Sequence, residues 1–158
     1  MKRLLLAILM AGVMPVAAIA GCAAGQVDIR LTNGGMARFS VELADDPATR
    51  ERGLMFRTEM AKSAGMLFLY EQPQPATFWM RNTLIPLDMI FADALGVVQH
   101  VHANAIPKDE TGIHGGTNIL AVLEINGGLA KQLGITAGAV IRHPNLEQST
   151  AAWPCASQ

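Results

Sequence analysis

Short apolar runs that alternate with polar positions dominate the chain from residue 27 onward. In residues 27–31 three aliphatic residues alternate with one acidic and one basic residue, a period of two that is typical of a half-exposed strand. Residues 36–43 repeat this alternation after Asn33-Gly34, a dipeptide that favours a tight turn. We therefore expect these two segments to form an antiparallel pair.

Three later segments are apolar at nearly every position, which predicts strands covered on both faces. They are residues 66–70, 87–91 and 119–125. Prolines at positions 73 and 75 are expected to end the first of them. The second carries Asp88, a carboxylate where water is scarce, and an unpaired charge there is costly. We therefore expect Asp88 to have a basic partner.

Two short helices are expected between the strands. Asp46 is a favourable N-cap, Pro47 suits the first helical position, and Gly53 ends the first helix. The second helix spans residues 129–133 and stops at Gly134. Further strands are expected at residues 97–102 and 139–142, and a surface loop at residues 103–118.

These elements predict a mainly β protein, because the strands outnumber the helices and no strand–helix–strand rhythm recurs. A compact antiparallel barrel or jelly-roll-like sandwich with two short helices fits best. The expected organisation is a signal peptide at residues 1–21, a spacer at 22–26, a single β domain at 27–144 and a C-terminal tail at 145–158.

Composition supports a packed domain, since 51% of the 158 residues are hydrophobic. The formal net charge is −1, and no basic block is present. A nucleic-acid partner is therefore not expected.

The first residues have the pattern of an export signal. Lys2 and Arg3 precede an apolar region at residues 4–14. Residues 18–20 fit ordinary signal cleavage, residues 19–22 are similar to a bacterial lipobox, and a retained membrane anchor is a third alternative. In each case we expect the protein to be exported. It would be periplasmic or, if lipidated, anchored to the membrane as a lipoprotein.

The chain has two cysteines, Cys22 and Cys155. An even number in an exported protein suggests a disulfide, worth roughly 4 kcal/mol in the chain-entropy model. If Cys22 carries a lipid instead, that lipid is the expected membrane contact, and Cys155 remains a free thiol. The sequence leaves both alternatives open.

Five sequence blocks, in this order, resemble the bacterial family known as domain of unknown function 192. They are RGLMFR (52–57), GMLF (65–68), FWMRNT (78–83), LDMIF (87–91) and LEINGG (123–128). The resemblance covers roughly residues 27–142 and implies a small, mainly β, jelly-roll-like domain that is often exported. It implies no reaction, and the histidine-bearing residues 100–118 lie outside its blocks.

The polar residues of these blocks are the main candidates for a ligand site. They are Arg52, Arg57, Trp79, Arg81, Asn82, Thr83, Asp88 and Glu124. As a pocket, the arginines would hold an anionic or carbonyl group and the carboxylates would position the arginines. The structural alternative is a set of internal ion pairs and turn hydrogen bonds.

Two weaker hypotheses involve metals. Soft thioethers near Trp79 suit Cu(I), although methionines more often fill irregular core space; these are Met55, Met66 and Met80. Histidines two apart on a strand, with one on the next loop, suit Zn²⁺ or Cu²⁺; these are His100, His102 and His114.

Catalysis receives little support, because no serine lies in a Gly-x-Ser-x-Gly elbow. Asp88 and Glu124 are the one carboxylate pair that would suit hydrolysis of an envelope polymer. We expect a binding or accessory module rather than an enzyme, with no cofactor and with a small polar ligand or envelope component as its partner.

Overall fold

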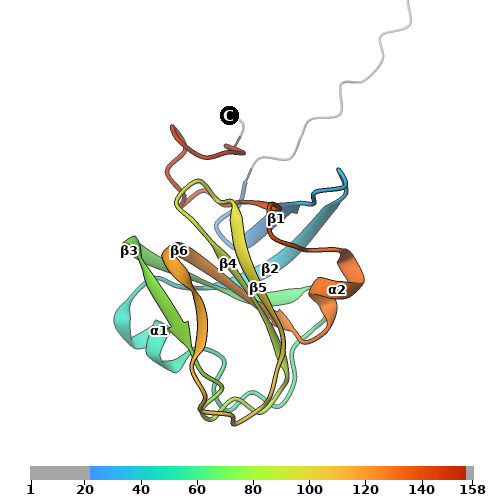
Figure 1. Ribbon diagram of the computed structural model, residues 1–158, viewed down its shortest axis with the longest axis vertical. Helices are drawn as coiled ribbons and strands as arrows, with labels where there is room; N and C mark the ends of the chain where they lie inside the picture. Colours follow the sequence, from blue (N-terminus) through green and yellow to red (C-terminus); the bar gives the residue numbers. More distant parts are fainter. Residues whose placement is uncertain (1–21, 156–158) are drawn as a thin grey trace, which may run out of the picture.

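The computed structural model describes residues 22–155 as one curled sheet of seven strands with two short helices (Figure 1). Its elements are β1 (Gln26–Arg30), β2 (Met36–Ala44), α1 (Pro47–Arg52), β3 (Ala64–Phe78), β4 (Leu87–Ala92), β5 (Val98–Ala105), β6 (Ile113–Asn126), α2 (Leu129–Leu133) and β7 (Val140–Arg142). The strand order is β5-β4-β6-β3-β2-β1-β7. The mainly β prediction is confirmed. The expected signal peptide lies outside the described residues, among which no helix is long and apolar enough to cross a membrane.

The sheet curls far enough for its two edge strands to meet at one end. The amide of Val98 at the start of β5 donates to the carbonyl of Ala139 at 2.8 Å, and the amide of Ile141 in β7 donates to Gly96 at 2.8 Å. These bonds pair part of the two sheet edges with each other, so the curled sheet forms a half-barrel. The predicted β1–β2 hairpin is also confirmed, with Val27 opposite Phe39.

One strand pair departs from the antiparallel prediction. β2 and β3 are parallel, with Val41 opposite Gly65. Parallel neighbours need a crossover, and the segment that contains α1 provides it. A single crossover does not create a recurring strand–helix–strand pattern, so the alternation of residues did not predict it.

The prediction that β3 ends before its prolines is wrong. β3 continues through Pro73 and Pro75, both exposed, where its pairing with β6 shifts register. Prolines are tolerated at such irregularities because no ladder bond requires their missing N–H. The strand bends enough there to place the Phe78 ring edge-on against Phe68, with ring centroids 5.1 Å apart.

The expected loop at residues 103–118 is likewise partly strand. β5 extends to Ala105, and β6 begins at Ile113 to pair with Phe78. The later part of β3 (residues 74–78) pairs with the first part of β6 (residues 113–119), and we call this pair the ribbon. The ribbon lies over the face of the sheet that contains Phe91. A Cβ atom at Gly115 would overlap the Phe91 ring, so the close approach of the two layers requires glycine.

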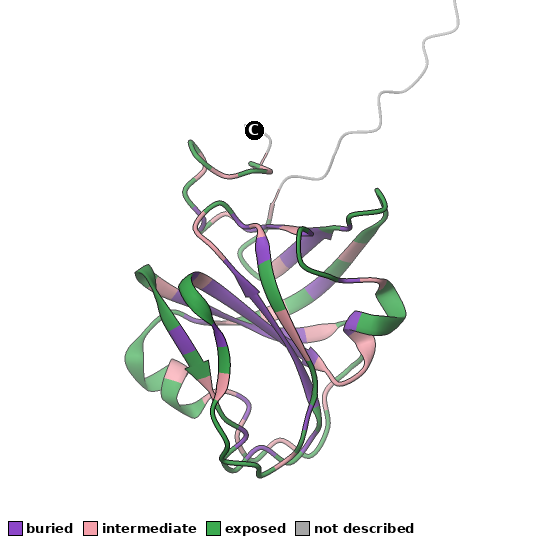
Figure 2. Cartoon of the chain, in the orientation of Figure 1, coloured by how far each residue is buried: buried purple, intermediate pink, exposed green. Residues whose placement is uncertain are grey.

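The sheet therefore has an apolar cluster on each face. Figure 2 shows the buried residues concentrated along the strands in the middle of the molecule. Ile29, Leu67 and Ile141 belong to the cluster inside the half-barrel. Phe68 and Phe91 belong to the cluster beneath the ribbon. Every residue of β4 is buried, as its apolar pattern predicted.

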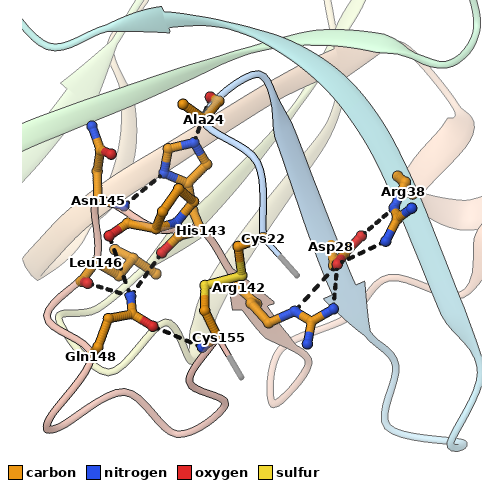
Figure 3. Close-up of a disulfide and its surroundings, with 11 residues drawn as sticks. Cys22, Ala24, Asp28, Arg38, Arg142, His143, Asn145, Leu146, Gln148 and Cys155 are labelled. Atoms are coloured by element: carbon orange, nitrogen blue, oxygen red, sulfur yellow. Dashed lines mark hydrogen bonds and ion pairs between the residues drawn. A yellow bond between two sulfur atoms is a disulfide. The ribbon is translucent and has the colours of Figure 1, made fainter. Parts of the chain in front are cut away.

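The two ends of the described chain are joined by a disulfide between Cys22 and Cys155 (Figure 3). Lipidation would use the same sulfur atom of Cys22. Of the two alternatives for this cysteine, the structure has the disulfide. Nearby, Asp28 receives hydrogen bonds from Arg38 and Arg142, each with a shortest distance of 2.6 Å. Burial raises the pKa of Asp28, but these bonds outweigh that effect and lower the pKa overall.

Candidate functional site

A cavity of about 310 Å³ opens between α1, β3 and the segment that follows β3, and one residue of β6 also lines it. Its walls combine aromatic rings with arginines. The lining residues are Arg50, Glu51, Arg52, Gly53, Leu54, Met55, Phe68, Tyr70, Thr77, Phe78, Trp79, Arg81, Thr83 and Glu124. The cavity is at the lower end of the size range of small-molecule sites, about 300–1,000 Å³.

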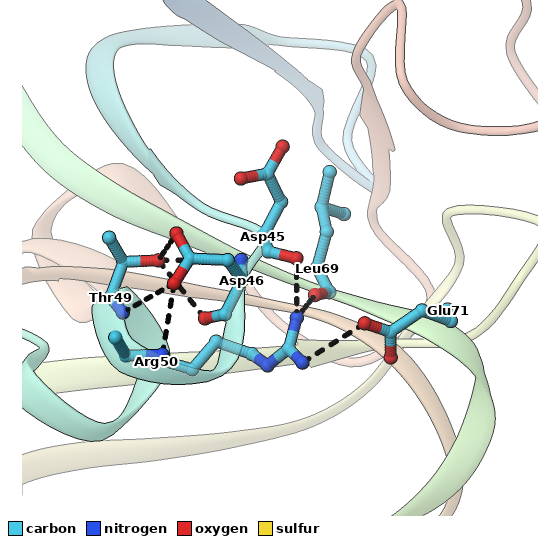
Figure 4. Close-up of polar contacts among 7 residues, drawn as sticks. Asp45, Asp46, Thr49, Arg50, Leu69 and Glu71 are labelled. Carbon is cyan, nitrogen blue, oxygen red and sulfur yellow. Dashed lines mark hydrogen bonds and ion pairs between the residues drawn. The ribbon is translucent and has the colours of Figure 1, made fainter.

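Local sequence explains how α1 presents its arginines. The Asp46 carboxylate accepts from the amides of Ala48 and Thr49 at 2.9 and 3.1 Å, which caps the helix as predicted (Figure 4). Gly53 has a φ of +47° and ends the helix after 6 residues. Arg50 and Arg52 are thereby placed in the last turn, beside the cavity.

Arg50 is a fixed part of the wall. Its guanidinium donates to the carbonyls of Asp45 and Leu69 at 2.7 and 2.8 Å, and to Glu71 at 3.1 Å (Figure 4). It also lies 5.5 Å from the centre of the Tyr70 ring. Because these contacts occupy the side chain, Arg50 positions neighbouring groups rather than offering a free cation.

Arg52 and Arg81 differ from Arg50 in this respect. Both are exposed at the rim, and neither forms an ion pair with any of residues 22–155. The Arg81 guanidinium lies 5.4 Å from the centre of the Trp79 ring, which is 47% exposed. The rim therefore offers two cations and an aromatic surface.

Arg57 does not line this cavity. Both of its terminal nitrogens donate to Glu42, at 2.6 and 2.5 Å, in a two-pronged ion pair. The hydrogen bond from Arg57 lowers the pKa of Glu42. The structural alternative considered for the polar residues thus describes the contacts of Arg57 well.

The turn after β3 forms one side of the cavity. The buried Met80 accepts on its carbonyl from the amides of Thr83 and Lys108, both at 3.0 Å. Asn82 has a φ of +56°, which asparagine tolerates, and its carbonyl accepts from the Phe56 amide at 2.8 Å. Thr83 lines the cavity, whereas Asn82 lies outside it.

Glu124 is the buried polar group of the cavity. It is 4% exposed, and its neighbours across the sheet are Met66 in β3 and Met89 in β4. No hydrogen bond or ion pair within residues 22–155 involves its carboxyl group. Burial raises the pKa of Glu124 to about 8, so the carboxyl group is largely neutral at pH 7.

Asp88 lies on the other face of the sheet. In β4 and β6 it is paired with Ile125, whereas Glu124 is paired with Met89, and adjacent positions point to opposite faces. The carboxylate pair considered for hydrolysis is therefore separated by the sheet. Cluster membership agrees, since Ile125 is inside the half-barrel and Met89 is beneath the ribbon.

The expected basic partner of Asp88 is also absent from the described chain. Its carboxylate accepts three backbone amide hydrogens instead, from Asn104 at 2.8 Å, Gly128 at 2.9 Å and Ala130 at 2.7 Å. Backbone donors stabilise a buried carboxylate as an arginine would, but no sequence pattern identifies them. Asp88 joins α2 to β5 and lies away from the cavity.

Five of the eight candidate residues line the cavity, namely Arg52, Trp79, Arg81, Thr83 and Glu124. Sequence reasoning did not select Tyr70, whose pKa is raised by burial. Strand alternation could have found it, because Met66, Phe68 and Tyr70 share one face of β3, and Met66 is the cross-strand neighbour of Glu124.

The histidines form no metal cluster in the part of the chain that is described. No group of three or more histidine, cysteine, aspartate or glutamate side chains there could hold a metal ion. The His100 ring stacks on Phe91, with centroids 5.9 Å apart, and His114 is hydrogen-bonded through Nδ1 to the Thr77 hydroxyl at 3.0 Å.

The methionines considered for copper serve other contacts. Met66 and Met80 are buried in the apolar cluster beneath the ribbon. The sulfur of Met55 accepts a weak hydrogen bond from the Asn82 side chain at 3.8 Å. These contacts agree with the role of methionine as a core filler.

Comparison with known proteins places this geometry among relatives without an assigned reaction. The family model DUF192, described as an uncharacterized ACR, matches residues 29–143. A crystal structure of a protein of unknown function from Novosphingobium aromaticivorans is similar, with 44% identity, a TM-score of 0.72, and coverage of 83% of this chain and 99% of that chain. A structure from Sinorhizobium meliloti, described as a putative transcription regulator, is similar with 38% identity, a TM-score of 0.73, and coverage of 77% and 95%. No curated protein matches this chain.

Proposed function

Because the chain belongs to the DUF192 family, which is described as uncharacterized, we propose its role from the cavity itself. The protein is a binding module of the cell envelope. It holds a small ligand that has an apolar, ring-like body and an anionic group.

One observation carries this proposal: two arginines without an acidic partner in residues 22–155 flank the mouth of an aromatic-lined cavity. Arg52 and Arg81 are free to bind a carboxylate or phosphate with paired N–H donors. The rings of Phe68, Phe78 and Trp79 offer an apolar surface to the rest of the ligand.

The placement in the cell envelope rests on two further features. The first residues have the charge and hydropathy pattern of an export signal. The disulfide between Cys22 and Cys155 suits an oxidising compartment such as the periplasm. Both features support export to that compartment.

Calorimetric titration with phenyl phosphate and benzoate tests the binding proposal, with benzyl alcohol as the uncharged comparison. Arg81→Ala should weaken binding of the two anions about five- to tenfold, because it removes charge-assisted hydrogen bonds. Binding of benzyl alcohol should change little.

Arg57→Ala is the matched control, since Arg57 is an arginine of the same region whose guanidinium is already bound to Glu42. It should leave the affinity for all three compounds unchanged. Absence of binding to both anions, or equal losses in the Arg57 and Arg81 variants, would contradict the proposal.

A further inference from the structure

We propose that the ligand carries an amide at its inner end and that Glu124 binds this amide as a neutral carboxylic acid. This inference rests on the proposed function and adds the chemical class of the ligand. The class is a small ring-bearing carboxylic acid that also has a primary carboxamide, with its carboxylate at the rim.

The starting point is the unsatisfied carboxyl group. Glu124 is 4% exposed, yet its side chain has no hydrogen-bond partner among residues 22–155, although buried polar groups in folded proteins are nearly always paired. Its neighbours across the sheet are two methionine side chains that offer no strong donor or acceptor.

The carboxyl oxygens are also within reach of a ligand. No fully enclosed side-chain oxygen or nitrogen in residues 22–155 lacks a partner, so the unpaired oxygens of Glu124 are not sealed off. Glu124 lines the cavity, which is the space that these oxygens adjoin. A ligand that reaches into the cavity is the natural source of their partner.

The charged and titratable groups around the cavity determine which partner fits. α1 contributes Arg50, Glu51 and Arg52, β3 contributes Tyr70, and the segment after β3 contributes Arg81. β4 contributes no charge, since the residue opposite Glu124 is methionine. The arginines lie at the wall and rim, so a cationic ligand group would have to pass like charges to reach Glu124.

An anionic group at the inner end is also disfavoured. It would leave water for a position beside a carboxyl group, and it would have no free cation next to it. The available arginines instead favour an anion at the outer end of the ligand.

A primary carboxamide matches a neutral carboxylic acid on both sides, because one of its N–H bonds lies on the same side as its carbonyl, whereas a trans peptide amide directs the two groups to opposite sides. The acid O–H donates to the amide carbonyl, and the other acid oxygen accepts from the amide N–H. Neither group is charged, so the pair forms in apolar surroundings with a small desolvation cost. The aromatic side chains of the cavity would then contact the ligand's ring, and Arg52 or Arg81 its carboxylate.

The test compares two probes that differ in one group. Terephthalic acid monoamide has the primary amide, ring and carboxylate, and monomethyl terephthalate replaces the amide nitrogen with an ester oxygen. Calorimetry should give the amide an affinity at least about tenfold higher, because the ester leaves one buried acceptor unpaired. Glu124→Gln, which also offers one donor and one acceptor, should keep that preference, and Glu124→Leu should abolish it.

A second readout separates binding from a purely structural role. Only the protonated acid donates to the amide carbonyl, so wild-type affinity should fall as the pH rises above 8. The Glu124→Gln variant should bind without this dependence, because a carboxamide does not titrate in this range. Circular dichroism at each pH checks that the variants remain folded.

The outcomes are distinguishable. If both probes bind equally and Arg81→Ala weakens both, the binding function stands and the amide inference is wrong. If neither probe binds while phenyl phosphate or benzoate does, the amide inference is again wrong. If no compound binds, both proposals fall.

Discussion

At the scale of single residues, Glu124 is the least satisfied group of the site. Its carboxyl group lies among apolar side chains in the middle of the sheet, and burial raises its pKa to about 8. In the unfolded chain the same group has the ordinary value near 4.5. The folded protein therefore holds a proton that the unfolded chain releases over this pH window.

This difference predicts a pH-dependent stability. The free energy of unfolding should fall by up to roughly 1.4 kcal/mol for each pH unit between about 4.5 and 8, because the unfolded state binds fewer protons there. The stabilising effect of the proton is complete below the lower value and is lost as the pH passes the upper one. Glu124→Gln should remove this slope in urea unfolding measured across the pH range.

Glu110→Gln serves as the control, since Glu110 is an exposed glutamate outside the cavity. It should follow the wild-type profile. Parallel profiles for the wild type and the Glu124 variant would show that burial at this position does not shift the proton equilibrium.

At the scale of elements, Asp88 in β4 joins α2 to the edge strand β5. Asp88→Ala removes the acceptor for three backbone amides. We expect a loss of about 3 kcal/mol or more in the free energy of unfolding, because buried donors without partners are costly. Urea unfolding measures this loss.

Asp45→Ala is the comparison, because Asp45 is exposed and its known contact uses the backbone carbonyl rather than the carboxylate. Its effect should stay within about 0.5 kcal/mol. A similarly small effect at Asp88 would mean that water replaces the carboxylate without penalty.

The elements also show what sequence could and could not predict. α1 was predicted to the residue, because Asp46, Pro47 and Gly53 act on their immediate neighbours. The bend of β3 was not, because it depends on contact between Phe68 and Phe78, and no local pattern encodes that meeting. Local signals specified the start and end of the helices, whereas tertiary packing determined how far β3 continues and where it bends.

The residues of the candidate site also differ in whether the sequence could identify them. The motif blocks contained the rim arginines, Trp79 and Glu124, because polar residues within apolar segments are visible in the sequence. The same criterion selected Asp88, which three backbone amides satisfy on the opposite face. Residue type alone does not distinguish a carboxyl group that lacks a partner from one that has backbone donors.

At the scale of the whole molecule, the disulfide joins residues 133 positions apart. Closing so long a loop restricts the unfolded chain, worth roughly 5 kcal/mol in the chain-entropy model. The Cys22→Ser, Cys155→Ser double variant should lose stability of this order in urea unfolding. Its affinity for the cavity probes should remain, because neither cysteine lines the cavity.

Intact mass spectrometry with alkylation checks the bond itself. Two alkyl groups should add to the native protein only after reduction. A lipid-sized mass increase together with one alkyl group before reduction would mean that Cys22 carries the lipid and Cys155 is free.

The joined ends have a consequence for how the molecule is presented. In Figure 1 the described chain begins and finishes at the top of the molecule, while α1 lies toward the lower left. Arg50 and Arg52 of α1 line the cavity, so its opening lies away from the joined ends. A tether at either terminus would therefore hold the protein by one pole and leave the opening facing outward. Immobilised in that orientation, the protein could be used to capture its natural ligand directly from an extract.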